Sequence, residues 1–111
     1  MLWHGLGWQT TQPAWLLLFV APVLEEIVFR GALQSWLLGL RKGRRQPFPP
    51  LTWANALTSM AFATLHGLKQ GGVLSWLTFF PSLVFGYCRE RYGTLVPCIV
   101  LHATYNAGIW L

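Results

Sequence analysis

The stretch PAWLLLFVAPVLEEIVFRGALQSWLLGL, residues 13–40, is apolar enough to enter a membrane, yet it carries three charges near its middle. The charged residues are Glu25, Glu26 and Arg30. A charge at the centre of a membrane helix costs about 2.5–3.5 kcal/mol on insertion scales. The stretch therefore predicts a helix whose charges either pair inside a helix bundle or have a chemical role there.

The composition of the chain favours a membrane protein. Of its 111 residues, 54% are hydrophobic and only 10% are charged, whereas a soluble domain is about 25% charged. The N-terminal segment MLWHGLGWQTTQ lacks the basic region and the cleavage site of a secretory signal peptide. We therefore expect an all-α, polytopic membrane helix bundle that forms a single domain over residues 1–111.

Four apolar segments are the expected transmembrane helices. They cover about residues 13–40, 51–68, 73–88 and 94–111. The first is longer than the roughly 20 residues that a span needs, so we expect it to tilt or to extend past the bilayer. The connecting segments contain RKGRRQPFPP, GLKQGG and RERYG, whose prolines, glycines and charges are typical of turns.

The basic residues predict the orientation of the helices. Six of the eight Lys and Arg residues lie in the first and third connecting segments: Arg41, Lys42, Arg44, Arg45, Arg89 and Arg91. Cytoplasmic loops carry an excess of such residues. The loop 41–50 is therefore expected to be cytoplasmic and both chain ends to face outward. The same distribution accounts for the net charge of +5 without a nucleic-acid partner.

The spacing of the three central charges separates one carboxylate from the other two groups. Glu26 and Arg30 are four residues apart and lie about 40° apart around a helix, whereas Glu25 lies about 140° from Arg30. We interpret Glu26 and Arg30 as a structural ion pair and expect Glu25 to face another group. Pro22 should make the backbone irregular one turn earlier, which at this depth is typical of a cavity wall.

Two later segments carry histidines at helical spacing from a second residue. Phe62 precedes His66 by four residues, and His102 precedes Asn106 by four. At about 1.5 Å per residue, Glu25 lies roughly 18 Å from the outer start of its span and His102 roughly 12 Å from the inner start of its own. In a hydrocarbon core about 30 Å thick the two are level. We predict that these polar groups converge on one cavity, with Phe62 shaping its wall.

Three kinds of function remain open for such a cavity. A carboxylate and a histidine can deprotonate a water while a second histidine and an amide stabilise an oxyanion, which is the chemistry of a glutamate-type protease. Glu25, His66 and His102 also form a set of ligands for a zinc protease, although no H-E-x-x-H motif is present. The third possibility is a non-catalytic immunity protein that binds a peptide in the membrane.

Three motifs together resemble one protease family. EEIVFR (25–30), FATLH (62–66) and HATYN (102–106) match the E-E-x-x-x-R, F-x-x-x-H and H-x-x-x-[ND] motifs of the CAAX-protease and bacteriocin-processing intramembrane proteases, the CPBP or Abi family. The resemblance implies that Glu25 activates water with His66 and that His102 and Asn106 bind the oxyanion. Glu26 and Arg30 would support the fold.

The resemblance also implies a class of substrate. Members of this family remove the last three residues after a lipidated cysteine, process peptides or sorting-signal tails, or serve bacteriocin immunity. By resemblance, this chain is an endopeptidase of a prokaryotic plasma membrane that needs no cofactor, with zinc as the alternative. Its expected partners are the bilayer and a membrane-associated protein or peptide.

Overall fold

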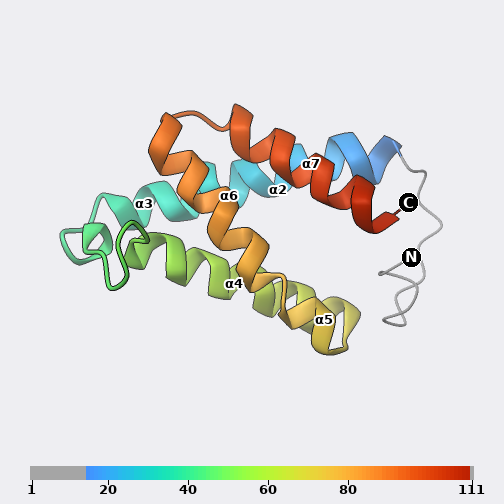
Figure 1. Cartoon of the computed structure of the whole chain (residues 1–111), viewed down its shortest axis with the longest axis horizontal. Helices are drawn as coiled ribbons and strands as arrows, with labels where there is room; N and C mark the ends of the chain where they lie inside the picture. The colour runs from blue at the N-terminus through green and yellow to red at the C-terminus, as the bar shows by residue number, and fades with distance from the viewer. Residues whose placement is uncertain (1–14, 111) are drawn as a thin grey trace.

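The computed structural model describes residues 15–110, which form an all-α bundle of four helices (Figure 1). The first helix is continuous from Leu16 to Leu38 and changes its hydrogen-bond pattern along its length. In chain order the elements are η1 (Leu16–Val20), α2 (Ala21–Glu26), η2 (Ile27–Gln34), α3 (Ser35–Leu38), η3 (Lys42–Arg44), α4 (Trp53–Gln70), α5 (Val73–Trp76), α6 (Phe79–Tyr92) and α7 (Val96–Trp110).

Pro22 makes the first helix irregular, as its sequence predicts. Proline lacks the backbone N–H that an α-helix would use to bond the preceding turn. The turn before Pro22, η1, is π-helical, and a second π-helical segment, η2, contains Arg30. Such wide turns in α-helices occur frequently at functional sites.

The third predicted helix, expected over residues 73–88, is instead two helices. α5 ends at Trp76 and α6 begins at Phe79. Pro81 explains the break, because it has no N–H to bond the carbonyl of Leu77 and is tolerated only in the first turn of a helix. α6 also runs past the predicted end to Tyr92, where Gly93 adopts a φ of 75° and terminates it.

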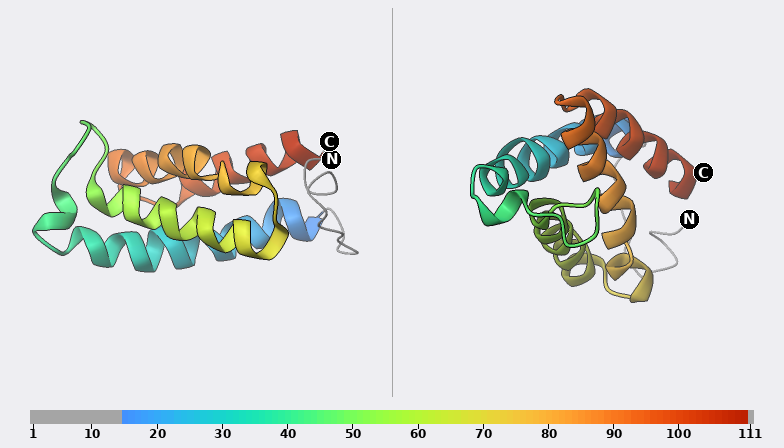
Figure 2. Two further views of the ribbon diagram at one scale, coloured as in Figure 1. Left: turned by 90° about the horizontal axis from the view of Figure 1, so that it is seen from below. Right: turned by 60° about the vertical axis from the view of Figure 1, so that its left-hand side comes forward.

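The basic connections gather at one end of the bundle. Figures 1 and 2 show the segment 39–52 at the same end as the connection from α6 to α7, whereas the α4–α5 turn lies at the opposite end. Arg41, Lys42, Arg44 and Arg45 belong to the first of these connections, and Arg89 and Arg91 to the last turn of α6. The expected grouping of cations at one end is therefore present.

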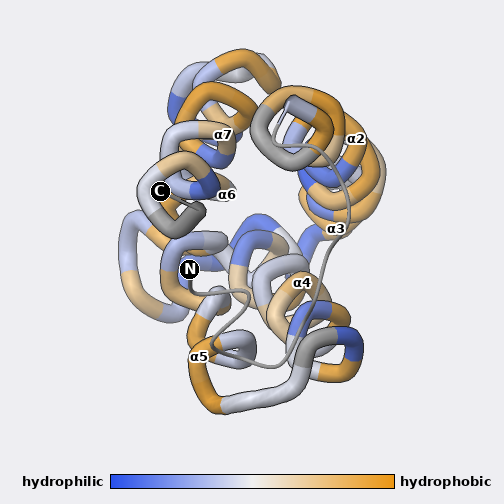
Figure 3. Tube along the Cα trace, turned by 90° about the vertical axis from the view of Figure 1, so that its right-hand side faces the viewer, coloured by the Kyte–Doolittle hydropathy of each residue, from blue (hydrophilic) through white to orange (hydrophobic). Residues whose placement is uncertain are grey.

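Polar residues fill the interior and large apolar residues cover the outside. Glu26, Arg30 and Gln34 are completely buried, whereas Leu24 and Val28, on the same helix, are 58% and 57% exposed. Figure 3 shows hydrophilic stretches of α2, α4 and α7 turned toward the centre of the bundle. This distribution is the reverse of that in a water-soluble domain.

The helices of the described region differ from the predicted spans in one further respect. Between residues 15 and 110, no helix combines the length and the hydropathy that crossing a membrane requires. The all-α fold with four helices is confirmed. That these helices lie in a bilayer stays a prediction at this point, and the predicted span ends before residue 15 lie outside the described residues.

Candidate active site

Glu25 meets both motif histidines at the centre of the bundle. Its carboxylate oxygens lie 3.6 Å from His66 Nε2 and 3.3 Å from His102 Nε2. The three residues come from α2, α4 and α7, so the site exists only when these helices pack together. Glu25 is 32% exposed, while both histidines are buried. The structure therefore brings together three of the four polar residues that the sequence predicts to converge, with the carboxylate as the accessible member.

Glu26 has a second partner that the sequence does not reveal. Its ion pair with Arg30 is present, with Arg30 Nη1 3.4 Å from Glu26 Oε2. The same oxygen also lies 2.9 Å from His102 Nδ1. A carboxylate accepts hydrogen bonds, so His102 donates its Nδ1–H to Glu26 and its Nε2 is the ring nitrogen that faces Glu25. Glu26 thereby orients His102 as well as pairing with Arg30.

Arg30 connects the first helix to α6. Its Nη2 donates to the carbonyl of Ser82 at 2.6 Å and also contacts the Ser82 hydroxyl. Arg30 and Ser82 are completely buried. The Arg30 guanidinium is thus held by Glu26 on its own helix and by Ser82 on α6. Removing the guanidinium would leave buried polar groups on both helices without its hydrogen bonds.

His66 is held by the backbone of its own helix. Its Nδ1 lies 2.8 Å from the carbonyl oxygen of Phe62, which can only accept, so Nδ1 carries the proton. The Nε2 atom that faces Glu25 is then free of a proton in the neutral ring and can accept a hydrogen bond. The F-x-x-x-H spacing has a direct physical reason, because residue i+4 of a helix lies above the carbonyl of residue i.

Two buried phenylalanines hold the histidine rings from the side. Phe62 contacts His66 with ring centroids 4.2 Å apart, and Phe85 stacks on His102 at 5.1 Å with the planes 18° apart. The Arg30 guanidinium lies 5.1 Å from the Phe62 ring centre and 5.7 Å from that of Phe85. Phe62 was predicted to shape the cavity, whereas Phe85 was missed because nothing in its local sequence distinguishes it from other apolar residues of α6.

Asn106 lies one turn beyond His102 on α7. It is buried, with 7% of its surface exposed. At a spacing of four residues the two side chains occupy one face of the helix. The structure therefore keeps Asn106 on the same side of α7 as His102.

A second polar cluster, Gln34–Glu90–Thr52, links three elements near the basic end of the bundle. Glu90 Oε2 accepts from Gln34 Nε2 at 2.6 Å and from Thr52 Oγ1 at 2.7 Å. Close packing continues next to it at Gly86, where an added Cβ would lie 2.0 Å from Asn55 Oδ1. Sequence reasoning missed this cluster, although Gln34 follows Glu26 and Arg30 at four-residue spacing, which marks one polar face of the helix.

The zinc-protease alternative is based on residue types alone, and the arrangement of the described side chains adds no support for it. In residues 15–110, no group of three or more His, Cys, Asp or Glu residues is arranged to hold a metal ion. Cys88 and Cys98 are both free thiols.

The comparison with protein families identifies the chain. A family model described as type II CAAX prenyl endopeptidase Rce1-like matches residues 7–108, which include Glu25, His66, His102 and Asn106. The chain belongs to this family. The Rce1-like chain is therefore a protease, and the family to which it belongs is embedded in membranes. No curated protein and no solved structure is significantly similar to it.

Proposed function

We propose that the chain is an intramembrane endopeptidase in which Glu25 activates the water that cleaves a peptide bond. The observation that carries this proposal is the convergence of a partly exposed carboxylate on two histidine Nε2 atoms, at 3.6 and 3.3 Å. General-base catalysis requires a base within reach of a water that is itself held in place. Glu25 and His66 Nε2 together provide the acceptors for such a water.

In the proposed reaction, His66 and Glu25 hold the water, and Glu25, His102 and Asn106 then act on the substrate. Glu25 removes a proton from the water as its oxygen attacks the carbonyl carbon of the substrate. In this step His102 acts as an imidazolium, with one N–H donated to Glu26 and the other, on Nε2, available to the substrate. This Nε2–H and the Asn106 amide donate hydrogen bonds to the oxygen that becomes negative, which lowers the energy of the transition state. Glu25 then returns its proton to the leaving nitrogen, the C–N bond breaks, and a carboxylic acid and a free amine result. The acid then loses the second proton of the former water and becomes a carboxylate.

Glu26, Phe85 and Phe62 act through the histidines. The hydrogen bond from His102 Nδ1 to Glu26 fixes the ring in its own plane, and the stack on Phe85 restricts rotation out of that plane. Phe62 supports His66 in both ways, through its carbonyl and its ring. These contacts keep both Nε2 atoms directed toward Glu25, and catalytic groups need this kind of support to hold productive geometry.

A position inside the bilayer is supported by the surface of the bundle. Phe19 is 66% exposed and Trp36 is 64% exposed, while Glu26 and Arg30 of the same helix are completely buried. In lipid, such outward apolar side chains are solvated and inward polar groups pair with one another. Together with the membrane-embedded nature of the family, this distribution favours a multi-pass membrane protein. The membrane we propose is a prokaryotic plasma membrane.

The substrate we propose is a membrane-associated protein or peptide that is cleaved near its C-terminus or at a sorting or leader segment. The family description refers to CAAX prenyl endopeptidases, and a buried site reached from the membrane suits a substrate that is itself held there. A bacteriocin-immunity role without cleavage is the competing function, and it would need the same cavity only for binding.

Activity should survive removal of metal ions. Purified protein in lipid nanodiscs, treated with EDTA and 1,10-phenanthroline and then freed of chelator, should cleave a membrane-anchored fluorogenic peptide within about twofold of the untreated rate. The reason is that Glu25, with the two histidines, can activate water without a Lewis acid. Stoichiometric zinc whose removal abolishes cleavage and whose return restores it would instead establish the zinc-protease mechanism.

Loop 41–50 should face the cytoplasm, because the cations at this end of the bundle obey the positive-inside rule. Single cysteines at Gln46 and at Gln70 can be compared in a background lacking Cys88 and Cys98. An impermeant maleimide added to intact cells should label position 70 and leave position 46 unlabelled until the cells are opened. Labelling of position 46 alone in intact cells would reverse the topology.

A further inference from the structure

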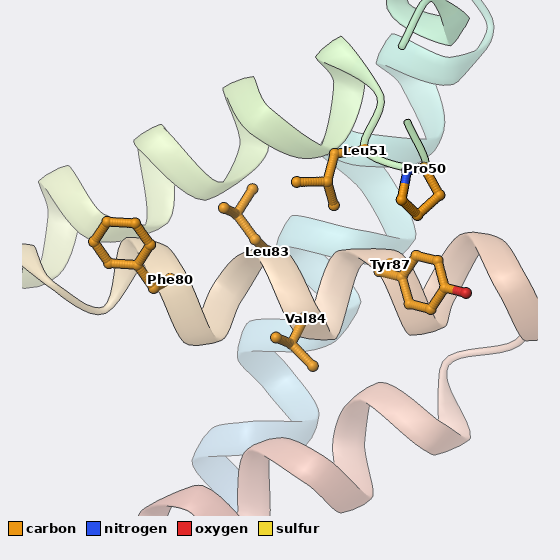
Figure 4. Close-up of a pocket in the computed structure, with 6 residues that line it drawn as sticks. All are labelled: Pro50, Leu51, Phe80, Leu83, Val84 and Tyr87. Atoms are coloured by element: carbon orange, nitrogen blue, oxygen red, sulfur yellow. The ribbon is translucent and has the colours of Figure 1, made fainter. Parts of the chain in front are cut away.

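An apolar groove runs along the outer face of the bundle between the segment 47–51, the start of α4, and α6. It consists of two hollows with volumes of about 480 and 430 Å³. Both are lined by Leu51, Phe80 and Leu83, so they are continuous with each other. Figure 4 shows one of them, with Leu51 and Pro50 on one wall and residues of α6 on the other.

The groove has a direction. Phe80, Val84 and Tyr87 follow one another along a single face of α6, and Figure 4 shows Phe80 at one end and Tyr87 near Pro50 at the other. From Phe80 to Tyr87 the helix rises about 10 Å. Half of a hydrocarbon core about 30 Å thick is roughly 15 Å. Along α6, the groove is therefore somewhat shorter than one leaflet is thick.

Two exposed arginines lie next to the residues that line the groove, and the guanidinium of one of them, Arg91, lies 5.6 Å from the centre of the Tyr92 ring. Arg91 is exposed and lies one turn beyond Tyr87, on the same face of α6. Arg45 is exposed, and its carbonyl accepts the N–H of Trp53 at 2.9 Å. Trp53 itself lines one of the two hollows, so this bond holds Arg45 next to the groove. Beyond these two arginines, the walls toward Phe80 are apolar. The groove thus joins a positively charged mouth to an apolar trough.

We propose that this groove binds one anionic phospholipid, with its phosphate between Arg45 and Arg91 and one acyl chain along α6. Charge complementarity selects an anionic head group, because cations at a membrane surface attract acidic lipids. The apolar trough favours a ligand with an acyl chain over a free phosphate ion, because a free phosphate has no apolar part to place there. The proposal rests on the membrane position stated under Proposed function, but not on the catalytic roles of Glu25 or the histidines.

The groove is separate from the peptidase site, which favours a bilayer lipid over the lipid group of a substrate. Glu25, His66 and His102 are absent from its lining. Leu83 lines the groove while its neighbour Ser82 contacts Arg30 in the interior, so α6 stands between the two sites. A neutral prenyl chain would also gain nothing from the two arginines at the mouth.

Native mass spectrometry of the full chain in detergent tests the proposal with phosphatidylglycerol and phosphatidylcholine of identical acyl chains. We expect one retained phosphatidylglycerol with an affinity at least tenfold above that of phosphatidylcholine. The double variant Arg45→Gln/Arg91→Gln should bind phosphatidylglycerol about thirtyfold more weakly, at roughly fivefold for each cation removed. Val84→Trp, at a position already 52% exposed, should fill the trough and weaken both lipids.

The matched control is Arg44→Gln/Lys69→Gln, which removes the same charge from two exposed residues. The Arg44 guanidinium donates to the Leu38 carbonyl, and Lys69 lies in the last turn of α4, at the end far from Trp53. Its affinity for phosphatidylglycerol should change less than threefold. The proposal would be overturned if the protein bound the two lipids with equal affinity, or if both double variants lost the same affinity for phosphatidylglycerol. It would also be overturned if Val84→Trp bound lipid as the unchanged protein does, or if farnesol bound as tightly as phosphatidylglycerol. Extraction of the protein from membranes by carbonate would instead contradict the membrane position itself.

Discussion

Glu25→Gln should lower the turnover of a membrane-anchored peptide by about 10²–10⁴-fold, which is the usual contribution of a general base. Glutamine has nearly the same shape but cannot accept the proton of the attacking water. The variant should remain folded, because Glu25 is partly exposed and the buried ion pair is made by Glu26 and Arg30. The measurement is single-turnover cleavage in nanodiscs at matched protein concentration, with the melting temperature recorded in parallel.

Glu90→Gln is the matched control for this experiment. Of the three acidic residues in the sequence, Glu90 is the one that lies outside the histidine cluster, and it accepts hydrogen bonds from Gln34 and Thr52. Its cleavage rate should stay within about threefold of the unchanged protein. Near-normal cleavage by a well-expressed Glu25→Gln protein would contradict the mechanism, and retention of an immunity phenotype by that variant would favour the binding function.

Arg30→Leu should be the most destabilising single substitution among the motif residues, by about 3–5 kcal/mol, because removing one member of a buried ion pair leaves the other charge uncompensated. The structure adds a second reason. Arg30 also donates to Ser82 on α6, so its loss removes a polar contact between two helices. The expected result is a large drop in the melting temperature and in the yield of folded protein.

Arg44→Leu is the matched control, because it also replaces an arginine by leucine. Arg44 is exposed, and its side chain donates a hydrogen bond to the Leu38 carbonyl. Its unfolding free energy should change by about 0.5 kcal/mol or less. A larger loss of stability in Arg30→Leu than in Arg44→Leu would show that the buried position of Arg30 matters. Equal losses would show that the bundle is sensitive to the loss of any positive charge. If both variants melt at the temperature of the unchanged protein, the Glu26–Arg30 pair does not stabilise the fold.

The sequence by itself predicted most of the helices and nominated the candidate site residues. Hydrophobic runs interrupted by prolines and glycines predicted four helices, and local spacing predicted the Glu26–Arg30 pair, because contacts between residues four apart depend only on helix geometry. It also predicted the family, since three motifs in the same order are far more specific than any one of them. The break before Phe79 was missed, although Pro81 carries a readable signal for it.

Only the tertiary structure decided how the site is held together. The bond from His102 to Glu26 joins residues 76 positions apart, and the contacts of Arg30 with Ser82 and of His102 with Phe85 likewise join different helices. Helical periodicity gives the face on which a residue lies, but not which face of another helix packs against it. That choice depends on how whole helices pack, and for this reason the sequence could nominate Glu25, His66 and His102 whereas only the fold could assign a second partner to Glu26.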